Sequence, residues 1–197
     1  MPRGFSENQT QQIREKLISS AFDAVPRTGV RKTTVEDLAK SAGISTGAFY
    51  KFFPTKETLF FVVYDRLEEG LKTEFTQFLE SSARLSAASI GAYIKGILRS
   101  EPMQILLRFL QKEDMEYMLR GVAPECVEDH LQKDVSFMRE VIHQCGVRGV
   151  QVTDNETLIL AYMQALFVLC ATRDQYGAYS DSIVDTFVDA FIGKITA

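Results

Sequence analysis

The sequence predicts an all-α protein in two parts, and three observations support this fold class. The 197-residue chain is 46% hydrophobic, which is enough to bury a core in one or two domains. Apolar residues recur at steps of three and four, as on a helix face, and no segment alternates as a β-strand does. Capping residues, glycines and prolines are closely spaced in the first third of the chain and divide it into short helices. We therefore expect a three-helix bundle with a helix-turn-helix in residues 1–55, followed by a larger helical domain in residues 56–197.

The first helix is expected to begin after Ser6 and to end before Pro26. Ser6 and Gln9 have the spacing of a capping box, in which a serine hydroxyl and a glutamine amide satisfy free backbone N–H groups. Pro26 and Gly29 mark the end of the helical pattern. Apolar residues share one face between these points: Ile13, Leu17, Ala21, Phe22 and Val25.

The second and third helices form the predicted helix-turn-helix. Thr33 and Glu36 have the spacing of a second capping box, and Gly43 suits the left-handed residue that ends a helix. Ser45 can then cap a third helix that starts at Thr46. Two short helices joined by a short turn that contains glycine are the plan of this motif.

The third helix is expected to have a buried face and an outward face. Phe49 and Phe53 lie four residues apart and therefore share the inward face. Small residues allow close approach to base edges and phosphates, and a phenol and an ammonium can donate hydrogen bonds to both. The outward residues follow this order, with small ones first and donors after them: Thr46, Gly47, Tyr50 and Lys51.

Charge is distributed unevenly along the chain. The net charge is −4, but residues 1–57 carry nine Lys and Arg against six Asp and Glu, and the remaining residues carry thirteen against twenty. A basic N-terminal block on an acidic body is typical of a protein that contacts an anion with one end. A split of this size also arises by chance, so it supports the DNA-binding interpretation without deciding it.

The segment GVRKTTVEDLAKSAGISTGAFYKFFPTKETLF resembles the N-terminal DNA-binding region of the TetR/AcrR transcriptional regulators. The matching positions run in one uninterrupted register, and the resemblance covers about residues 8–65. Lys56 falls in the first turn of the next helix, where it would add a charge to the anion-attracting helix end. By resemblance, the residues that contact double-stranded DNA are Thr34, Ser45, Thr46, Gly47, Tyr50, Lys51 and Lys56.

The rest of the chain is predicted to be a separate helical body. A long apolar stripe runs from Phe60 to Phe78 and fades near Ser81. Pro102 and Pro124 suit the first turns of later helices.

The last two helical segments, residues 155–176 and 181–195, are apolar on two sides. A helix with two apolar faces needs two partners. One is the protein's own core, and the other is either a second copy of the chain or a deeper part of the same core. The resemblance favours a homodimer, because TetR-like proteins associate through their final two helices. The candidate interface residues are Tyr162, Leu166, Leu169, Phe187 and Phe191.

Methionines and aromatic residues in the body are candidates for an effector pocket. Methionine fills irregular space and adapts to varied ligands, and the resemblance implies a pocket between the middle helices. Ordinary core packing is the alternative for each of these residues. The candidates are Tyr93, Met103, Phe109, Met115, Met118, Phe137, Met138 and Met163.

No catalytic or metal-binding motif is evident. The chain lacks H-E-x-x-H and a phosphate-binding glycine loop, and it has two histidines. His130, near Glu125 and Asp129, fits a solvated charged helix face, so we expect no metal and no cofactor. Three cysteines without C-x-x-C spacing and the lack of a signal peptide favour a cytoplasmic protein.

These features predict a non-enzymatic transcriptional regulator, a repressor that a small-molecule effector releases from a palindromic operator. Its partners would be operator DNA, an unknown effector and a second copy of the chain, with no membrane. The main alternative is a helical ligand-binding or enzymatic protein whose N-terminal bundle is structural. A third hypothesis is a DNA-binding dimer without a ligand response.

Overall fold

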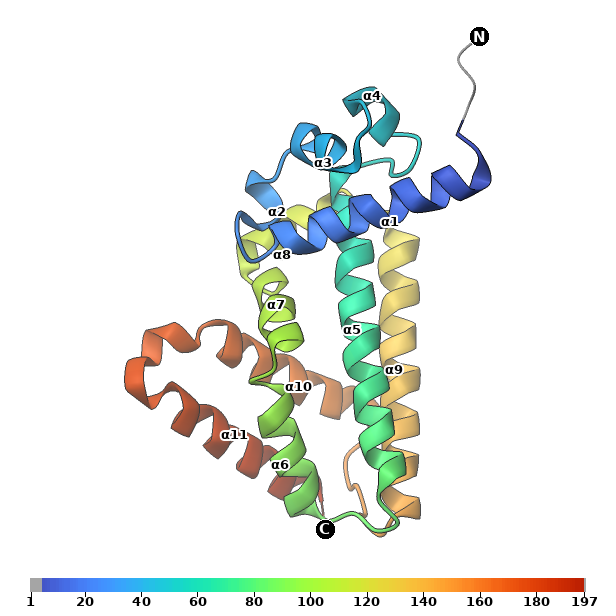
Figure 1. The fold of residues 1–197 in the computed structure, drawn as a ribbon. Helices are drawn as coiled ribbons and strands as arrows, with labels where there is room; N and C mark the ends of the chain where they lie inside the picture. Colours follow the sequence, from blue (N-terminus) through green and yellow to red (C-terminus); the bar gives the residue numbers. More distant parts are fainter. Residues whose placement is uncertain (1–4, 197) are drawn as a thin grey trace.

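The computed structural model describes residues 5–196 and confirms the all-α fold class (Figure 1). In this range the only strand-like pairing is one isolated antiparallel bridge between Val152 and Thr196. A 3-10 segment, η1 (Arg173–Tyr179), joins the last two α-helices. The α-helices are α1 (Glu7–Ala24), α2 (Gly29–Lys32), α3 (Val35–Ala42), α4 (Thr46–Phe49), α5 (Lys56–Ser81), α6 (Ala87–Ile97), α7 (Glu101–Phe109), α8 (Lys112–Arg120), α9 (Pro124–Val147), α10 (Glu156–Ala171) and α11 (Ser180–Ile195).

Local capping explains where the N-terminal helices begin and end. The predicted capping box of Ser6 and Gln9 is present at the start of α1, and α1 ends just before Pro26. Gly43 has a φ of 73°, the left-handed conformation that ends α3. The Ser45 hydroxyl accepts a hydrogen bond from a backbone N–H of α4, as predicted for an N-cap.

Two local predictions were wrong. The N-cap of α3 is Thr34, whereas the Thr33 hydroxyl is buried and donates to the Gly29 carbonyl at 2.7 Å. The reason is α2, a single helical turn that the sequence pattern did not indicate and that takes up the Thr33 side chain. The third helix is also shorter than expected, since α4 ends at Phe49 and the chain continues to Phe53 as a hydrogen-bonded turn.

The long helices α5 and α9 run side by side in the same direction and form the spine of the body (Figure 1). The helices α6 and α7 lie beside them, and α8 packs between the N-terminal helices and α5. The helices α10 and α11 form a hairpin, drawn in orange and red, in which α10 packs on α9 and α11 on α6. No single helix among residues 5–196 is long and apolar enough to cross a membrane, and the bent pair Glu156–Ala171 and Arg173–Ile195 qualifies by length and composition only.

One apolar core extends through both parts of the chain. Phe49, Phe60 and Phe109 are among its largest fully buried side chains, and they come from α4, α5 and α7. An ion pair of 2.7 Å between Glu15 and Arg66 also joins α1 to α5. Because α5 contacts both parts, the domain division after residue 55 stays a prediction.

Candidate nucleic-acid interface and internal cavity

Two buried rings hold α4 against the rest of the N-terminal unit. Phe49 and Phe53 are 0% and 1% exposed, and their ring centroids are 6.1 Å apart. The Arg14 guanidinium of α1 lies 4.5 Å from the centroid of the Phe53 ring, and Arg14 Nη1 donates to the Phe52 carbonyl at 3.4 Å. These contacts give the outward residues of α4 a rigid support.

The outward surface of this unit carries five of the seven residues predicted to contact DNA. Ser45, Thr46, Gly47, Tyr50 and Lys51 are all exposed, and Tyr50 is 55% exposed. A Cβ atom added at Gly47 would meet nothing within 4 Å, so packing inside this chain does not require a glycine there. The small size of Gly47 is therefore available for close approach of an external molecule.

Thr34 is also exposed, and its side chain caps α3. Its Oγ1 accepts a hydrogen bond from the Asp37 N–H at 3.1 Å and donates to Asp37 Oδ2 at 2.6 Å. Lys32 and Lys40 are exposed cations near the two ends of α3 that the sequence analysis did not select. Their charge was the only signal that could have identified them.

Lys56 does not lie on the outward surface, and its predicted phosphate contact is wrong in this structure. Its side chain is buried, and Nζ donates to the Thr33 and Arg31 carbonyls at 2.8 and 3.2 Å. The ammonium also lies 4.9 Å from the Tyr117 ring centroid. Burial lowers the pKa of Lys56. Lys56 therefore ties the end of α2 and α8 to the start of α5.

The start of α5 makes a second connection to the body. The hydroxyl groups of Thr55 and Thr58 lie 3.0 and 3.4 Å from the Gly121 carbonyl, which follows α8. Thr55 also caps α5, as the sequence predicted. Movement of α8 would therefore be transmitted to the residues that follow α4.

The body holds a partly open cavity of about 1230 Å³ that is lined by residues of each helix from α5 to α11. Most of its lining is apolar, with a small group of charged side chains on one wall. The predicted pocket residues that line it are Met103, Met115, Phe137, Met138 and Met163.

Three predicted pocket residues do not line this cavity. Phe109 and Met118 are 0% exposed and belong to the packed core. Tyr93 stacks on Phe78 with ring centroids 4.1 Å apart. Sequence spacing placed these side chains in the right part of the protein, but it could not show which of two inward directions each would take.

The outer face of the α10–α11 hairpin exposes apolar side chains. Phe187 is 54% exposed, Val168 55% and Leu158 38%. The predicted interface residues Tyr162 and Phe191 are half-buried and pack edge to face, with centroids 5.9 Å apart. Exposed apolar side chains such as Phe187 are suited to burial against a partner.

The other two predicted interface residues differ from each other. Leu169 is half-buried, as expected near the edge of an apolar face. Leu166 is 5% exposed and lines the cavity, so its assignment to the dimer interface is wrong. Leu166 occupies the second apolar side of α10, which the protein's own body covers.

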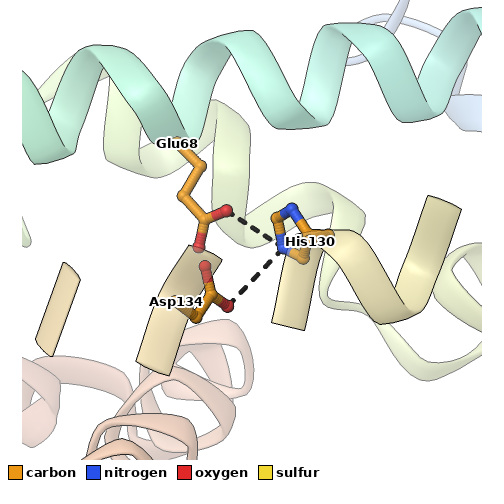
Figure 2. A group of neighbouring side chains, drawn as sticks. All are labelled: Glu68, His130 and Asp134. Atoms are coloured by element: carbon orange, nitrogen blue, oxygen red, sulfur yellow. Dashed lines mark ion pairs between the residues drawn. The ribbon is translucent and has the colours of Figure 1, made fainter. Parts of the chain in front are cut away.

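His130 does not lie on a solvated face with Glu125 and Asp129, as the sequence suggested. It is 7% exposed, and its ring lies among carboxylates of α5 and α9 on the cavity wall (Figure 2). Asp65 and Glu68 come from α5, and this pairing between two helices left no signal in the sequence. Burial and the nearby Asp134 charge raise the pKa of Glu68.

A family model described as "Bacterial regulatory proteins, tetR family" matches residues 17–63, which hold the helix-turn-helix and the start of α5. This N-terminal segment of the chain is similar to the regulatory proteins of the TetR family. The matched residues include α3, α4 and the start of α5, where the sequence predicted the helix-turn-helix.

The curated proteins that the chain resembles carry several names. It is 31% identical over 112 residues to the nucleoid occlusion factor SlmA of Glaesserella parasuis, which covers 57% of this chain and 49% of SlmA. It is 25% identical over 142 residues to the probable acrEF/envCD operon repressor of Escherichia coli, which covers 70% of this chain and 64% of the repressor. The chain thus spans about half to two thirds of the length of these curated relatives.

The whole fold also resembles a solved structure. A putative TetR-family transcriptional regulator from Mesorhizobium loti has a TM-score of 0.64 at 18% identity, over 95% of this chain and 98% of that chain.

Proposed function

We propose that this protein is a transcriptional repressor that binds a palindromic operator as a homodimer and leaves it when a small molecule binds in the cavity. The observation that carries the proposal is the outward face of α4, supported by the buried rings of Phe49 and Phe53 within the TetR-family segment. A short helix with small residues first and donors after them fits the wall of a major groove.

The outward residues would make two kinds of contact. Tyr50 is proposed to donate to a phosphate, which positions the protein without reading sequence. Thr46 and Lys51 are proposed to reach base edges, because they lie beside the small Gly47 that permits close approach. Thr34 and Ser45, at the starts of α3 and α4, would contact the sugar-phosphate backbone of the DNA.

The exposed hairpin face supports the proposed homodimer. Phe187 and Leu158 would be covered by the same face of a second chain, since a two-fold interface uses one patch twice. Two-fold symmetry would present the two α4 surfaces symmetrically, so the operator should be an inverted repeat.

The cavity supports the proposed effector response. Its largely apolar lining fits an apolar or amphipathic small molecule. Met115 of α8 lines the cavity, and the residue after α8, Gly121, receives the hydroxyl contacts of α5. An effector that moves α8 would thereby change the α4 surface. Such coupling would amount to about 1–3 kcal/mol and would act equally in both directions.

Operator binding tests this proposal. The protein would select DNA from a random duplex pool, and affinities for the selected operator, its point variants and random DNA would be measured by fluorescence anisotropy at two salt concentrations. Tyr50→Phe should lower the affinity for all DNA sequences by a similar factor. Lys51→Ala should reduce the difference in affinity between the operator and its point variants at one position in each half-site.

Lys133→Ala provides the matched control, because Lys133 is an exposed lysine on α9 whose side chain is paired with Asp129. It should leave DNA binding unchanged. If the wild-type protein selects no sequence and the α4 variants bind random DNA as it does, the proposal is wrong. A helical ligand-binding protein with a structural N-terminal bundle would then remain.

A further inference from the structure

A histidine ring on the cavity wall has carboxylate oxygens next to both of its nitrogens. His130 Nδ1 lies 3.0 Å from Asp65 Oδ1, and His130 Nε2 lies 3.1 Å from Glu68 Oε2 and 3.6 Å from Asp134 Oδ2. Figure 2 shows the Glu68 side chain of α5 and the Asp134 side chain of α9 converging on the same ring nitrogen. The side chains of Phe61 and Tyr64 pack on the ring at centroid distances of 5.6 and 5.3 Å and limit its rotation.

A neutral imidazole cannot satisfy this arrangement. It has one N–H, so whichever nitrogen carries the proton, the other presents a lone pair to a carboxylate oxygen. If Nδ1 donates to Asp65, the Nε2 lone pair faces oxygens of Glu68 and Asp134. The point where these three groups converge can hold either a second proton on the ring or a metal cation.

A second, independent observation points to the same place. Glu68 Oε2 is a fully buried side-chain oxygen that has no hydrogen-bond partner within residues 5–196. Although it lies 3.1 Å from His130 Nε2 and 3.5 Å from Lys72 Nζ, neither contact has hydrogen-bond geometry. A buried oxygen without a hydrogen-bond partner is costly, even beside the Lys72 ammonium, so a ligand bound at this point would stabilise it.

The local charges also leave room for a divalent ion. Asp65, Glu68 and Asp134 supply three carboxylates, whereas Lys72 supplies one ammonium, whose Nζ lies 2.6 Å from Asp134 Oδ1. With a neutral His130, two negative charges remain in a half-buried region. Lys72 occupies Oδ1 of Asp134 and leaves Oδ2 directed towards His130.

We propose that His130 Nε2, Glu68 Oε2 and Asp134 Oδ2 bind a divalent first-row transition-metal ion of the zinc class. Bonds of about 2.0–2.2 Å in a tetrahedral site place neighbouring ligand atoms about 3.4 Å apart. The two separations from Nε2, 3.1 and 3.6 Å, bracket that value, and all three ligand atoms lie within 4.8 Å of one another. One imidazole and two carboxylates suit Zn²⁺ and Co²⁺ better than Mg²⁺ or Ca²⁺.

Asp65 would act as the positioning residue of this site. A metal-binding histidine commonly donates its second N–H to a carboxylate, which fixes the ring and makes the other nitrogen a better ligand. The contact of Asp65 Oδ1 with His130 Nδ1 has this form. Asp65 and Lys72 also line a surface groove between α5 and α9, and Lys72 lines the cavity as well.

The fourth coordination position would face the cavity, because the three ligand residues all line it. The proposal does not depend on DNA binding, and its test uses no DNA. A failure here would therefore leave the proposed repressor function untouched, and a failure of that function would leave the metal site standing.

The test is a titration of full-length, tag-free, metal-stripped protein with Co²⁺, followed by visible absorption and by competition with Zn²⁺. We expect one Co²⁺ per chain, displaced by Zn²⁺ and not by Mg²⁺. His130→Gln and Glu68→Gln should each lower the affinity by at least about 10-fold, and Asp65→Asn by about 10–100-fold. His143→Gln is the matched control, because His143 is the exposed histidine of the same helix, and it should bind as the wild type does.

Circular dichroism of the metal-free variants would show that the helices persist, and Glu68→Gln keeps the size of the side chain if His130→Gln does not fold. The proposal is overturned if no saturable Co²⁺ spectrum appears, or if His130→Gln and Glu68→Gln retain wild-type affinity. It is also overturned if His143→Gln removes the spectrum. In each of these cases the cluster is a proton-bridged ion network and not a metal site.

Discussion

The substitution Lys56→Met tests whether Lys56 stabilises the fold or contacts DNA. The substitution keeps most of the aliphatic stem and removes the ammonium that donates to the Thr33 and Arg31 carbonyls. The resemblance to TetR-like regulators implied that Lys56 contacts a DNA phosphate, but the observed side chain is buried. We therefore expect Lys56→Met to lower stability and to leave the salt dependence of DNA binding nearly unchanged.

The expected loss of stability follows from those contacts. Hydrogen bonds that involve a charged group contribute about 1.5–3 kcal/mol each, and a carbonyl left without a partner in the interior costs about 1–3 kcal/mol. Part of this is offset, because the lysine no longer has to be desolvated, a cost that appears as its lowered pKa. We expect a net loss of about 2 kcal/mol, equivalent to a fall in Tm of about 4–8 °C for a chain of this size.

Urea unfolding at one fixed protein concentration would measure the loss, since a dimer's apparent stability depends on concentration. Lys51→Met is the control, because Lys51 is exposed and its loss should change stability by less than about 0.5 kcal/mol. Lys51→Met should instead reduce the slope of log affinity against log salt by as much as about 1 if Lys51 meets a phosphate, and less if it reads a base. The reasoning fails if Lys56→Met is as stable as Lys51→Met and itself lowers the salt slope by about 1.

Three further predictions concern the interface, the thiols and the turn. Phe187→Asp should convert a dimer to a monomer, as measured by light scattering. Val147 is also exposed, and Val147→Asp should leave the dimer intact. A wild-type protein that is monomeric at micromolar concentration would contradict the premise. Iodoacetamide at pH 8 should label Cys126, which is exposed, and spare Cys170, because burial raises the pKa of Cys170 to about 11; equal labelling of both would argue against this packing. Gly43→Ala should cost about 1–2 kcal/mol in urea unfolding because of its φ of 73°, with no steric term since nothing lies within 4 Å, and an unchanged midpoint would show that the turn adapts.

The N-terminal unit illustrates what local sequence can predict. Ser6 with Gln9, Gly43, Ser45 and Thr55 act within a few residues of themselves, and each cap was found where its pattern indicated. The one-residue error at Thr33 has a local cause as well, because the short helix α2 changed the partner of that hydroxyl group.

The body illustrates what local sequence cannot predict. Helical periodicity showed that Leu166 and Phe187 lie on apolar faces. It could not show that Leu166 lines the cavity and that Phe187 is exposed to solvent. It likewise grouped Met118 with Met103, although the first lies in the packed core and only the second lines the cavity.

The sequence by itself determined several helix caps of the N-terminal unit, the helix-turn-helix and the outward order of Thr46, Gly47, Tyr50 and Lys51. These depend on dihedral preferences, caps and face periodicity, all of which act over one or two helical turns. Only the tertiary structure decided the partners of the buried charged groups. Lys56 meets carbonyls 23 and 25 residues away, and His130 meets carboxylates of α5 that are 62 and 65 positions earlier in the chain. A long polar side chain has no preferred partner until the helices are packed, because burial then removes water and leaves only the groups within reach to satisfy it.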